Sequence, residues 1–148
     1  MIKRSYVLDL VSKFQSKIPN IDDMKMSYRY CLKTENIVFN DHEKLDDFLN
    51  LRQRLIVEEF SEFIFAMKRK DVVMIADALI DLSYLILGQC DLMNLPYDSL
   101  FQEVHRSNMT KIQGDIKLSP SGKILSNNYY ERPRLLMLLR NHVSDRRA

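Results

Sequence analysis

Five acidic residues interrupt a stretch of the sequence, residues 55–88, whose composition is otherwise that of the interior of a helical bundle. They are Glu58, Glu59, Glu62, Asp77 and Asp81. Carboxylates are rarely buried unless a partner compensates their charge. The function of this stretch therefore depends on what pairs with these five side chains.

The spacing of the acids places them on two helical faces. At about 100° per residue, Glu59 and Glu62 share one face of a helix, and Glu58 lies at the edge of that face. Asp77 and Asp81 share a face of the following helix. The other residues on these faces are mostly apolar, so we expect both faces to turn inward, opposed in an antiparallel hairpin with its turn at residues 68–71. These neighbours are Leu51, Leu55 and Ala66 on the first helix and Met74, Tyr84 and Gly88 on the second.

Carboxylates that face one another in a low-dielectric interior repel strongly, and a hard divalent cation would offset this repulsion. Mg²⁺, or Mn²⁺ in its place, takes oxygen ligands, and Mg²⁺ also binds phosphate oxygens. We therefore predict that Glu59, Glu62, Asp77 and Asp81 are metal ligands. No histidine lies in either cluster, which disfavours a di-iron site. The alternative is a solvated acidic face, and for Glu58 this alternative stays open.

A later helix carries two side chains that suit phosphate oxygens beside a metal ion. Asn108 shares a helical face with Phe101 and Val104, and Lys111 follows on the same side. The amide offers donors and the ammonium a mobile positive charge. A solvated helix end is the alternative for Lys111. We expect Arg106 to point away from this face, on the surface.

Hydrophobic periodicity and capping residues predict a mostly helical chain. We expect Asp41 and Asp71 to be the N-caps of the second and third helices. A turn is expected around Ser121 and Gly122. Residues 20–40 show no clear period and are expected to form a long loop with short turns. The expected helices cover residues 4–17, 41–69, 72–93 and 97–112, with a last helix opened by Pro133.

The composition of the chain indicates its fold class. The chain has 148 residues, three glycines and many helix-forming residues, and we predict one all-α domain spanning residues 1–148. A net charge of +2 makes no case for nucleic-acid binding. Acidic and basic residues interrupt the apolar runs, so no membrane span is expected. Two isolated cysteines, Cys31 and Cys90, fit a reducing cytoplasm.

Four blocks of the sequence resemble the all-α nucleoside triphosphate pyrophosphohydrolases, the MazG-like and phosphoribosyl-ATP pyrophosphohydrolase-like superfamily, and especially its Cof-like branch. They are LRQRLIVEEFSEF, DALIDLSYLILG, FQEVHRSNMTK and GKILSNNYY, in the order of the branch, and the match covers about residues 45–130. The superfamily pattern is E-x-x-E followed by E-x-x-D. Glu59 and Glu62 match the first motif, and Asp81 ends the second. Ala78 stands at the second glutamate position, but the branch has D-A-L-x-D, so Asp77 takes the place of that ligand.

The resemblance implies a helical bundle with a central antiparallel hairpin, completed by dimerisation and sometimes assembled as a tetramer. It implies Mg²⁺-dependent hydrolysis of a nucleoside triphosphate between the α- and β-phosphates, giving the monophosphate and pyrophosphate, with a role in nucleotide-pool house-cleaning. The catalytic carboxylates would be Glu58, Glu59 and Glu62, of which Glu58 or Glu62 activates the attacking water. Asn108 and Lys111 would hold the phosphates.

Residues that bind the rest of the substrate are less constrained. Arg29, in the segment MSYRYCLK, is a candidate to pair with a phosphate, and an ordinary surface position is at least as good an explanation. Tyr84 is a further substrate-binding candidate, although packing in the core is the interpretation that we favour for it.

Two other function classes stay open. The first is a non-enzymatic helical interaction module, whose partner-binding or dimer helix would be RPRLLMLLRNHV. The second is a metal phosphohydrolase that acts on a phosphomonoester or on another phosphorylated nucleotide. Stabilisation by Mg²⁺ would argue against the first, and release of pyrophosphate would argue against the second.

Overall fold

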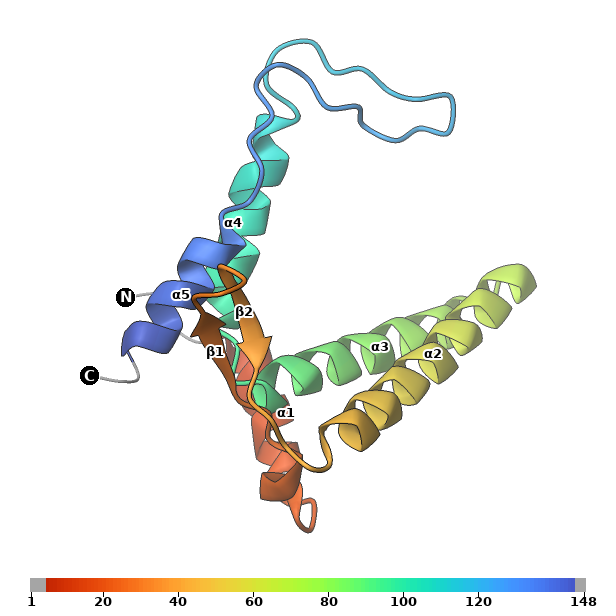
Figure 1. Cartoon of the computed structure of the whole chain (residues 1–148). Helices are drawn as coiled ribbons and strands as arrows, with labels where there is room; N and C mark the ends of the chain where they lie inside the picture. The colour runs from red at the N-terminus through yellow and green to blue at the C-terminus, as the bar shows by residue number, and fades with distance from the viewer. Residues whose placement is uncertain (1–4, 146–148) are drawn as a thin grey trace. The chain divides into compact units, whose positions relative to one another are not determined.

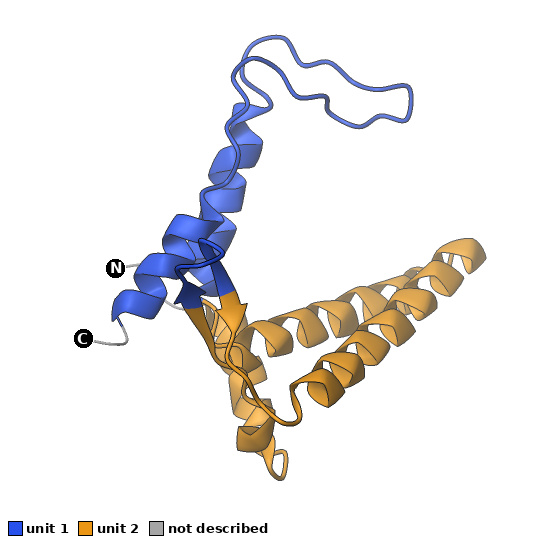
Figure 2. Ribbon diagram, viewed as in Figure 1, with its two compact units in different colours: residues 1–3, 30–37, 96–148 blue, residues 4–29, 38–95 orange. Residues whose placement is uncertain are grey.

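The computed structural model describes residues 5–145, which form two compact units (Figures 1 and 2). Of the described residues, unit 2 comprises 5–29 and 38–95, and unit 1 comprises 30–37 and 96–145. The single-domain assignment stays a prediction. The described elements are α1 (Tyr6–Gln15), the 3₁₀-helix η1 (Ile21–Met24), β1 (Tyr28–Cys31), β2 (Asn36–Phe39), α2 (Leu45–Arg69), α3 (Val72–Leu92), α4 (Tyr97–Thr110) and α5 (Leu135–Asp145).

The largest part of unit 2 is a helical hairpin of α2 and α3 (Figure 1). After Arg69, Lys70 adopts the left-handed conformation with φ of 56°, and Val72 begins α3. Asp71 caps α3 as predicted, because its carboxylate accepts a hydrogen bond from the N–H of Met74 at 3.1 Å. So short a turn makes the two helices antiparallel, which confirms the predicted central hairpin.

Arg52 of α2 is buried although it is charged. Its Nη2 donates to the backbone oxygen of Leu85 at 2.6 Å, and its Nε donates to Oε1 of Gln89 at 3.2 Å, both on α3. Burial lowers the pKa of this guanidinium, and the two hydrogen bonds replace part of the hydration that it loses. Because these hydrogen bonds place Arg52 of α2 opposite Leu85 and Gln89 of α3, they fix how the two helices are aligned along their lengths, which is the register of the hairpin.

The helix α1 packs against α3. Leu8 and Val11 are buried, and the Phe14 ring meets the Tyr84 ring edge to face with centroids 5.5 Å apart. Gly88 leaves room for the buried Gln15 side chain, because a Cβ atom at Gly88 would lie 2.7 Å from Nε2 of Gln15.

The structure corrects the expectation that residues 20–40 form only a loop with turns. The strands β1 and β2 pair into a small hairpin, so the all-α prediction is right apart from these two strands. Their sequences, YRYC and NIVF, are rich in the aromatic and β-branched residues that favour strands. Four residues are too few to show a clear alternation, which is why the periodicity did not reveal them.

The helix ends differ slightly from the predicted ones. α2 begins at Leu45 with Lys44 at the N-cap position, so the prediction that Asp41 caps this helix is wrong. α4 ends at Thr110, shortly before its predicted end. The ends of the first predicted helix lie outside α1, and Arg4 lies outside the described residues. Such shifts are expected where no side chain caps the helix end.

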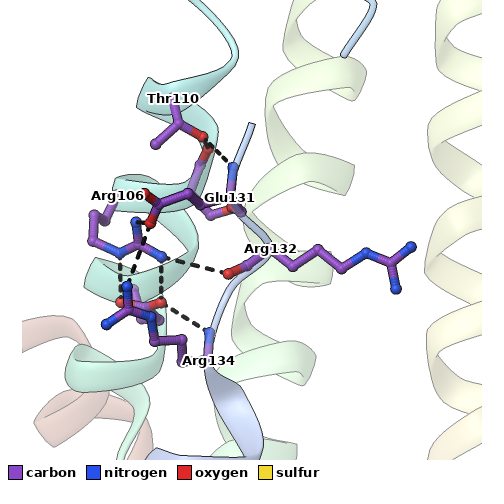
Figure 3. Close-up of polar contacts among 7 residues, drawn as sticks. Arg106, Thr110, Glu131, Arg132 and Arg134 are labelled. Carbon is purple, nitrogen blue, oxygen red and sulfur yellow. Dashed lines mark hydrogen bonds and ion pairs between the residues drawn. The ribbon is translucent and has the colours of Figure 1, made fainter. Parts of the chain in front are cut away.

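In unit 1, an ion-pair network joins α4 to the segment that leads into α5 (Figure 3). Arg106 donates to both carboxylate oxygens of Glu103, at 2.9 and 2.8 Å, and to Glu131 at 2.8 Å. The backbone N–H of Arg134 donates to Glu103 at 2.8 Å. These hydrogen bonds lower the pKa of Glu103 to about 2, with the larger effect from the Arg106 side chain and the smaller one from the Arg134 N–H. We expected Arg106 to lie on the surface, and its side chain is 36% exposed. The sequence analysis did not predict its ion pair with Glu131, because the two residues are distant in the sequence.

The chain between α4 and α5 turns where the sequence predicted a turn. Gly122 has φ of 81°, its N–H donates to the backbone oxygen of Ser119, and Leu118 and Ile124 form an isolated antiparallel bridge. The last helix, α5, begins shortly after Pro133. Pro133 therefore precedes the helix as predicted.

Within the described residues, α3 is the one helix that is long and apolar enough to cross a membrane, which the sequence analysis did not expect. Length and composition alone are weak support for a membrane span, because the core helix of a soluble protein passes the same test. Asp77 and Asp81 lie inside this helix, and charged residues are expensive inside a bilayer.

We expect Arg52→Met to lower the free energy of unfolding by about 2 kcal/mol, because it removes two partly buried hydrogen bonds between α2 and α3. Chemical denaturation followed by circular dichroism measures the change. Arg54→Met is the matched control, since Arg54 is exposed on the same helix, and its effect should stay within about 0.5 kcal/mol. Equal effects of the two substitutions would contradict a structural role for Arg52.

Candidate active site

Three of the predicted site residues lie on α2, in unit 2. Glu58 and Glu62 are exposed, and Glu59 is half-buried. The Oε2 atom of Glu59 is buried and has no hydrogen-bond partner in residues 5–145. An unpaired buried carboxylate oxygen destabilises a fold, so Glu59 is the acid whose position most needs an explanation.

The register of the hairpin brings the acids of α3 to the level of Glu59. Arg52 bonds to Gln89 across the hairpin. Glu59 lies seven residues after Arg52, and Leu82, the neighbour of Asp81, lies seven residues before Gln89. Antiparallel helices advance equally in opposite directions, so Glu59 and Asp81 lie at about the same level.

The electrostatics of Glu59 confirm that the acids lie near one another. Its pKa is raised above the ordinary value of 4.5, first by burial and then by repulsion from Glu62, Asp81, Glu58 and Asp77. The structure therefore brings four acids of the sequence prediction within electrostatic reach of the fifth, Glu59. Each additional negative charge makes ionisation of Glu59 less favourable.

The expectation that both acidic faces turn inward is wrong for the single chain. Glu58, Glu62, Asp77 and Asp81 are exposed, and Glu59 is only half-buried. The physical reason is that a two-helix hairpin buries one narrow stripe of each helix. On α2 and α3 this stripe includes Ala66 and Ala78, and the acids lie beside it.

The donor set around Glu59 suits a hard divalent cation. All five side chains offer carboxylate oxygens, and one of these oxygens is buried without a partner. As the side chains stand, no group of three or more His, Cys, Asp or Glu residues within the described ranges lies close enough to hold a metal ion. Repulsion keeps carboxylates apart in the absence of a cation, and exposed side chains reorient at little cost.

Asn108 and Lys111 lie at the end of α4, in unit 1. Lys111 Nζ donates to Oδ1 of Asn108 at 3.0 Å, so the structure brings together the two predicted phosphate ligands. The Lys111 ammonium also lies 5.1 Å from the centre of the Tyr130 ring. The sequence analysis missed this contact, because a long loop separates the two residues and no local pattern signals it.

The two remaining substrate-binding candidates lie in unit 2. Arg29 is on β1 and is exposed. Tyr84 is on α3, and its ring packs edge to face on Phe14, as the packing interpretation expects. About a third of Tyr84 stays exposed, at 36%.

Without divalent cations, we expect Glu59→Gln to stabilise the protein at neutral pH. The raised pKa means that the native state binds more protons than the unfolded state, so the Glu59 contribution to stability falls as pH rises above 4.5. The advantage of the glutamine variant should therefore be largest at neutral pH and vanish as pH falls below 4.5. Unfolding free energies measured with chelator across this range test the prediction.

The control for this experiment is Glu43→Gln, at an exposed acid just before α2, which should show no such pH-dependent difference. Adding saturating Mg²⁺ should stabilise the wild type and not Glu59→Gln. A glutamine variant that is less stable than the wild type in chelator at neutral pH would contradict the interpretation of Glu59.

Comparison with known proteins identifies the family. A sequence profile of the phosphoribosyl-ATP pyrophosphohydrolase family matches residues 32–108, which is 77 of the 148 residues. The match includes the five acids and ends at Asn108, and no curated protein matches the chain. Enzymes of this family are pyrophosphohydrolases that act on acid anhydrides and typically depend on Mg²⁺. Since the match spans more than half of the chain, the protein belongs to the phosphoribosyl-ATP pyrophosphohydrolase family, in the MazG-like all-α superfamily that its sequence blocks resemble.

Proposed function

We propose that the protein is a Mg²⁺-dependent pyrophosphohydrolase that converts a ribo- or deoxyribonucleoside triphosphate to the monophosphate and pyrophosphate. The observation that carries this proposal is the acidic cluster around Glu59, inside the segment that matches the family. A polyphosphate binds together with Mg²⁺, and this cation would offset part of the negative charge of the carboxylates. Family membership itself implies a nucleotide pyrophosphohydrolase activity.

In this proposal, Glu59, Glu62, Asp77 and Asp81 hold Mg²⁺, with Mn²⁺ as a substitute. When bound, the cation supplies positive charge beside the phosphates as they react. Glu59 offers the unpaired buried oxygen, and the other three acids are exposed and can turn toward it. The cation would remove the repulsion that raises the Glu59 pKa.

Hydrolysis also needs a group that takes a proton from the attacking water. Glu58 and Glu62 are exposed carboxylates beside Glu59, and we propose that one of them has this role. The water oxygen forms a bond to the α-phosphorus while the bond from that phosphorus to the α–β bridging oxygen breaks. The proton passes to the carboxylate, and pyrophosphate leaves with the electron pair.

We further propose that Asn108 and Lys111 bind phosphate oxygens, because the structure joins an exposed amide to an ammonium. Exposed Arg29 is a weaker candidate for the same chemistry. The ring contact of Tyr84 with Phe14 favours packing over substrate binding for that residue. A house-cleaning role and a cytoplasmic location belong to the same proposal, and Cys31 and Cys90 form no disulfide.

The experiment measures pyrophosphate release from a panel of nucleoside triphosphates and from phosphoribosyl-ATP, with Mg²⁺ and with chelator. We expect Mg²⁺-dependent release from one or a few of these substrates. Glu59→Gln should lower kcat/KM about 100-fold or more, because it removes a predicted metal ligand. Glu43→Gln, outside the cluster, should retain the wild-type rate.

Other products would favour the other function classes. Orthophosphate without pyrophosphate would indicate a phosphomonoesterase or another phosphohydrolase. No product from any substrate, with no change in thermal stability on adding Mg²⁺, would favour an interaction module instead. Equal rates for Glu59→Gln and the wild type would remove the acidic cluster from the mechanism.

We also propose that two copies of the chain associate through α2 and α3, as a dimer that could assemble further into a tetramer. Each helix carries a regular stripe of exposed apolar side chains. On α2 they are 39–55% exposed and on α3 45–76%. Soluble monomers rarely leave large apolar patches in water, and a second helical hairpin would complete a bundle over them. The stripes are Val57, Phe60, Ile64 and Met67 on α2, and Val72, Leu79 and Ile86 on α3.

We expect Phe60→Arg to convert the protein from a dimer to a monomer at micromolar concentration, because it places a charge in the centre of the proposed interface. Sedimentation velocity measures the change. Leu32→Arg is the matched control, since Leu32 is 83% exposed in the turn between β1 and β2 and should leave the mass unchanged. A wild type that sediments as a monomer at high concentration would contradict the proposed dimer.

A further inference from the structure

Two neutral groups contact the ammonium of Lys111, which lies at the C-terminal end of α4. Its Nζ donates to Oδ1 of Asn108 at 3.0 Å and lies 5.1 Å from the centre of the Tyr130 ring. Over the part of the chain that the structure describes, Lys111 forms no ion pair. The ammonium is therefore held from two directions while its positive charge stays uncompensated.

Asn108 uses its amide oxygen for this hydrogen bond, so the N–H donors of its amide are left for another partner. Asn108 is exposed and Lys111 is half-buried. Together they present several N–H donors and one positive charge at one place. Phosphate oxygens are the ligand class that this combination recognises.

The backbone on both sides of the Tyr130 ring is anchored to the last turn of α4. The N–H of Glu131 donates to Oγ1 of Thr110 at 3.0 Å (Figure 3). The side-chain amide of Asn127 donates to the backbone oxygen of Lys111 at 3.0 Å. The N–H of Tyr130 itself donates to the backbone oxygen of Asn127 at 3.2 Å. The ring is thus fixed relative to the side chain that it contacts, although it belongs to a long loop.

We propose that Tyr130 is a positioning residue that holds the Lys111 ammonium, together with Asn108, in place for phosphate oxygens. The chemical nature of the contact supports this role. A carboxylate would also hold the ammonium, but it would cancel the charge and compete with phosphate. An aromatic face attracts a cation through its quadrupole and adds no net charge. The inference rests on the proposed function, because it takes the polyphosphate of the substrate as the ligand of Lys111.

The test compares Tyr130→Leu, which removes the ring, with Tyr130→Phe, which keeps the aromatic face. Tyr129→Leu is the control, because its ring is 58% exposed in the same loop. The probe is inorganic pyrophosphate with Mg²⁺, and its affinity is measured by calorimetry. We expect Tyr130→Leu to weaken binding about 5-fold and the other two variants to stay within about 2-fold of the wild type.

A double-mutant cycle separates positioning from a general effect on the loop. In a Lys111→Met background, Tyr130→Leu should cause no further loss of pyrophosphate affinity, because the ring would have no ammonium to hold. A further loss of the same size would show that Tyr130 acts only through loop structure, and the inference would be wrong. It would also be wrong if the wild type binds no pyrophosphate.

A second measurement needs neither ligand nor turnover. The ring current of an aromatic side chain should shift the Hε protons of Lys111 upfield in the wild type and in Tyr130→Phe, but not in Tyr130→Leu. If the variants show this pattern and the expected pyrophosphate affinities while no nucleotide is hydrolysed, the proposed function fails and the positioning role stands. If nucleotides are hydrolysed and Tyr130→Leu matches the wild type in binding, the positioning role alone fails.

Discussion

Repulsion among five carboxylates is the constraint on which the interpretation of this protein depends. The α2–α3 hairpin places Glu62, Asp81, Glu58 and Asp77 around Glu59, and one oxygen of Glu59 is buried without a hydrogen-bond partner. A fold that gathers like charges loses stability unless something binds to them. A stability gain alone would be reached more simply with apolar side chains at these positions. The Mg²⁺ that we propose as the partner of these acids would supply this compensation, and enzymes of the family typically depend on Mg²⁺.

The scaffold around the acids explains how this repulsion is tolerated. Asp71 caps α3 next to a very short turn, and Arg52 bonds α2 to α3 at the far end of the hairpin. The small side chains of Ala66 and Ala78 are buried, while four of the acids stay exposed beside the contact. Water can therefore screen the charge of these four acids in the single chain, whereas burial disfavours the charged form of Glu59.

In unit 1, two basic residues, Arg106 and Lys111, have contacts of different kinds. Arg106 is engaged by Glu103 and Glu131, so it ties α4 to the segment before α5 and has little left to offer a ligand. Lys111, the C-cap residue of α4, is held by an amide oxygen and an aromatic ring. The two basic residues thus differ in how they are held: Arg106 is paired with carboxylates, whereas Lys111 contacts neutral groups that leave its charge uncompensated.

The sequence by itself determined the helical class, the central hairpin with its Asp71 cap, the five acids and the family, because these depend on local periodicity and on residue spacing within neighbouring helices. Only the tertiary structure decided which acid has a buried oxygen, because two helices in contact shield a narrow stripe whose position depends on the register that Arg52 sets. The tertiary structure also decided the partners of Arg106 and Lys111, because Glu131 and Tyr130 reach them across a long loop. Contacts between residues distant in the chain depend on how the loop is anchored, and no local pattern of residues carries that information.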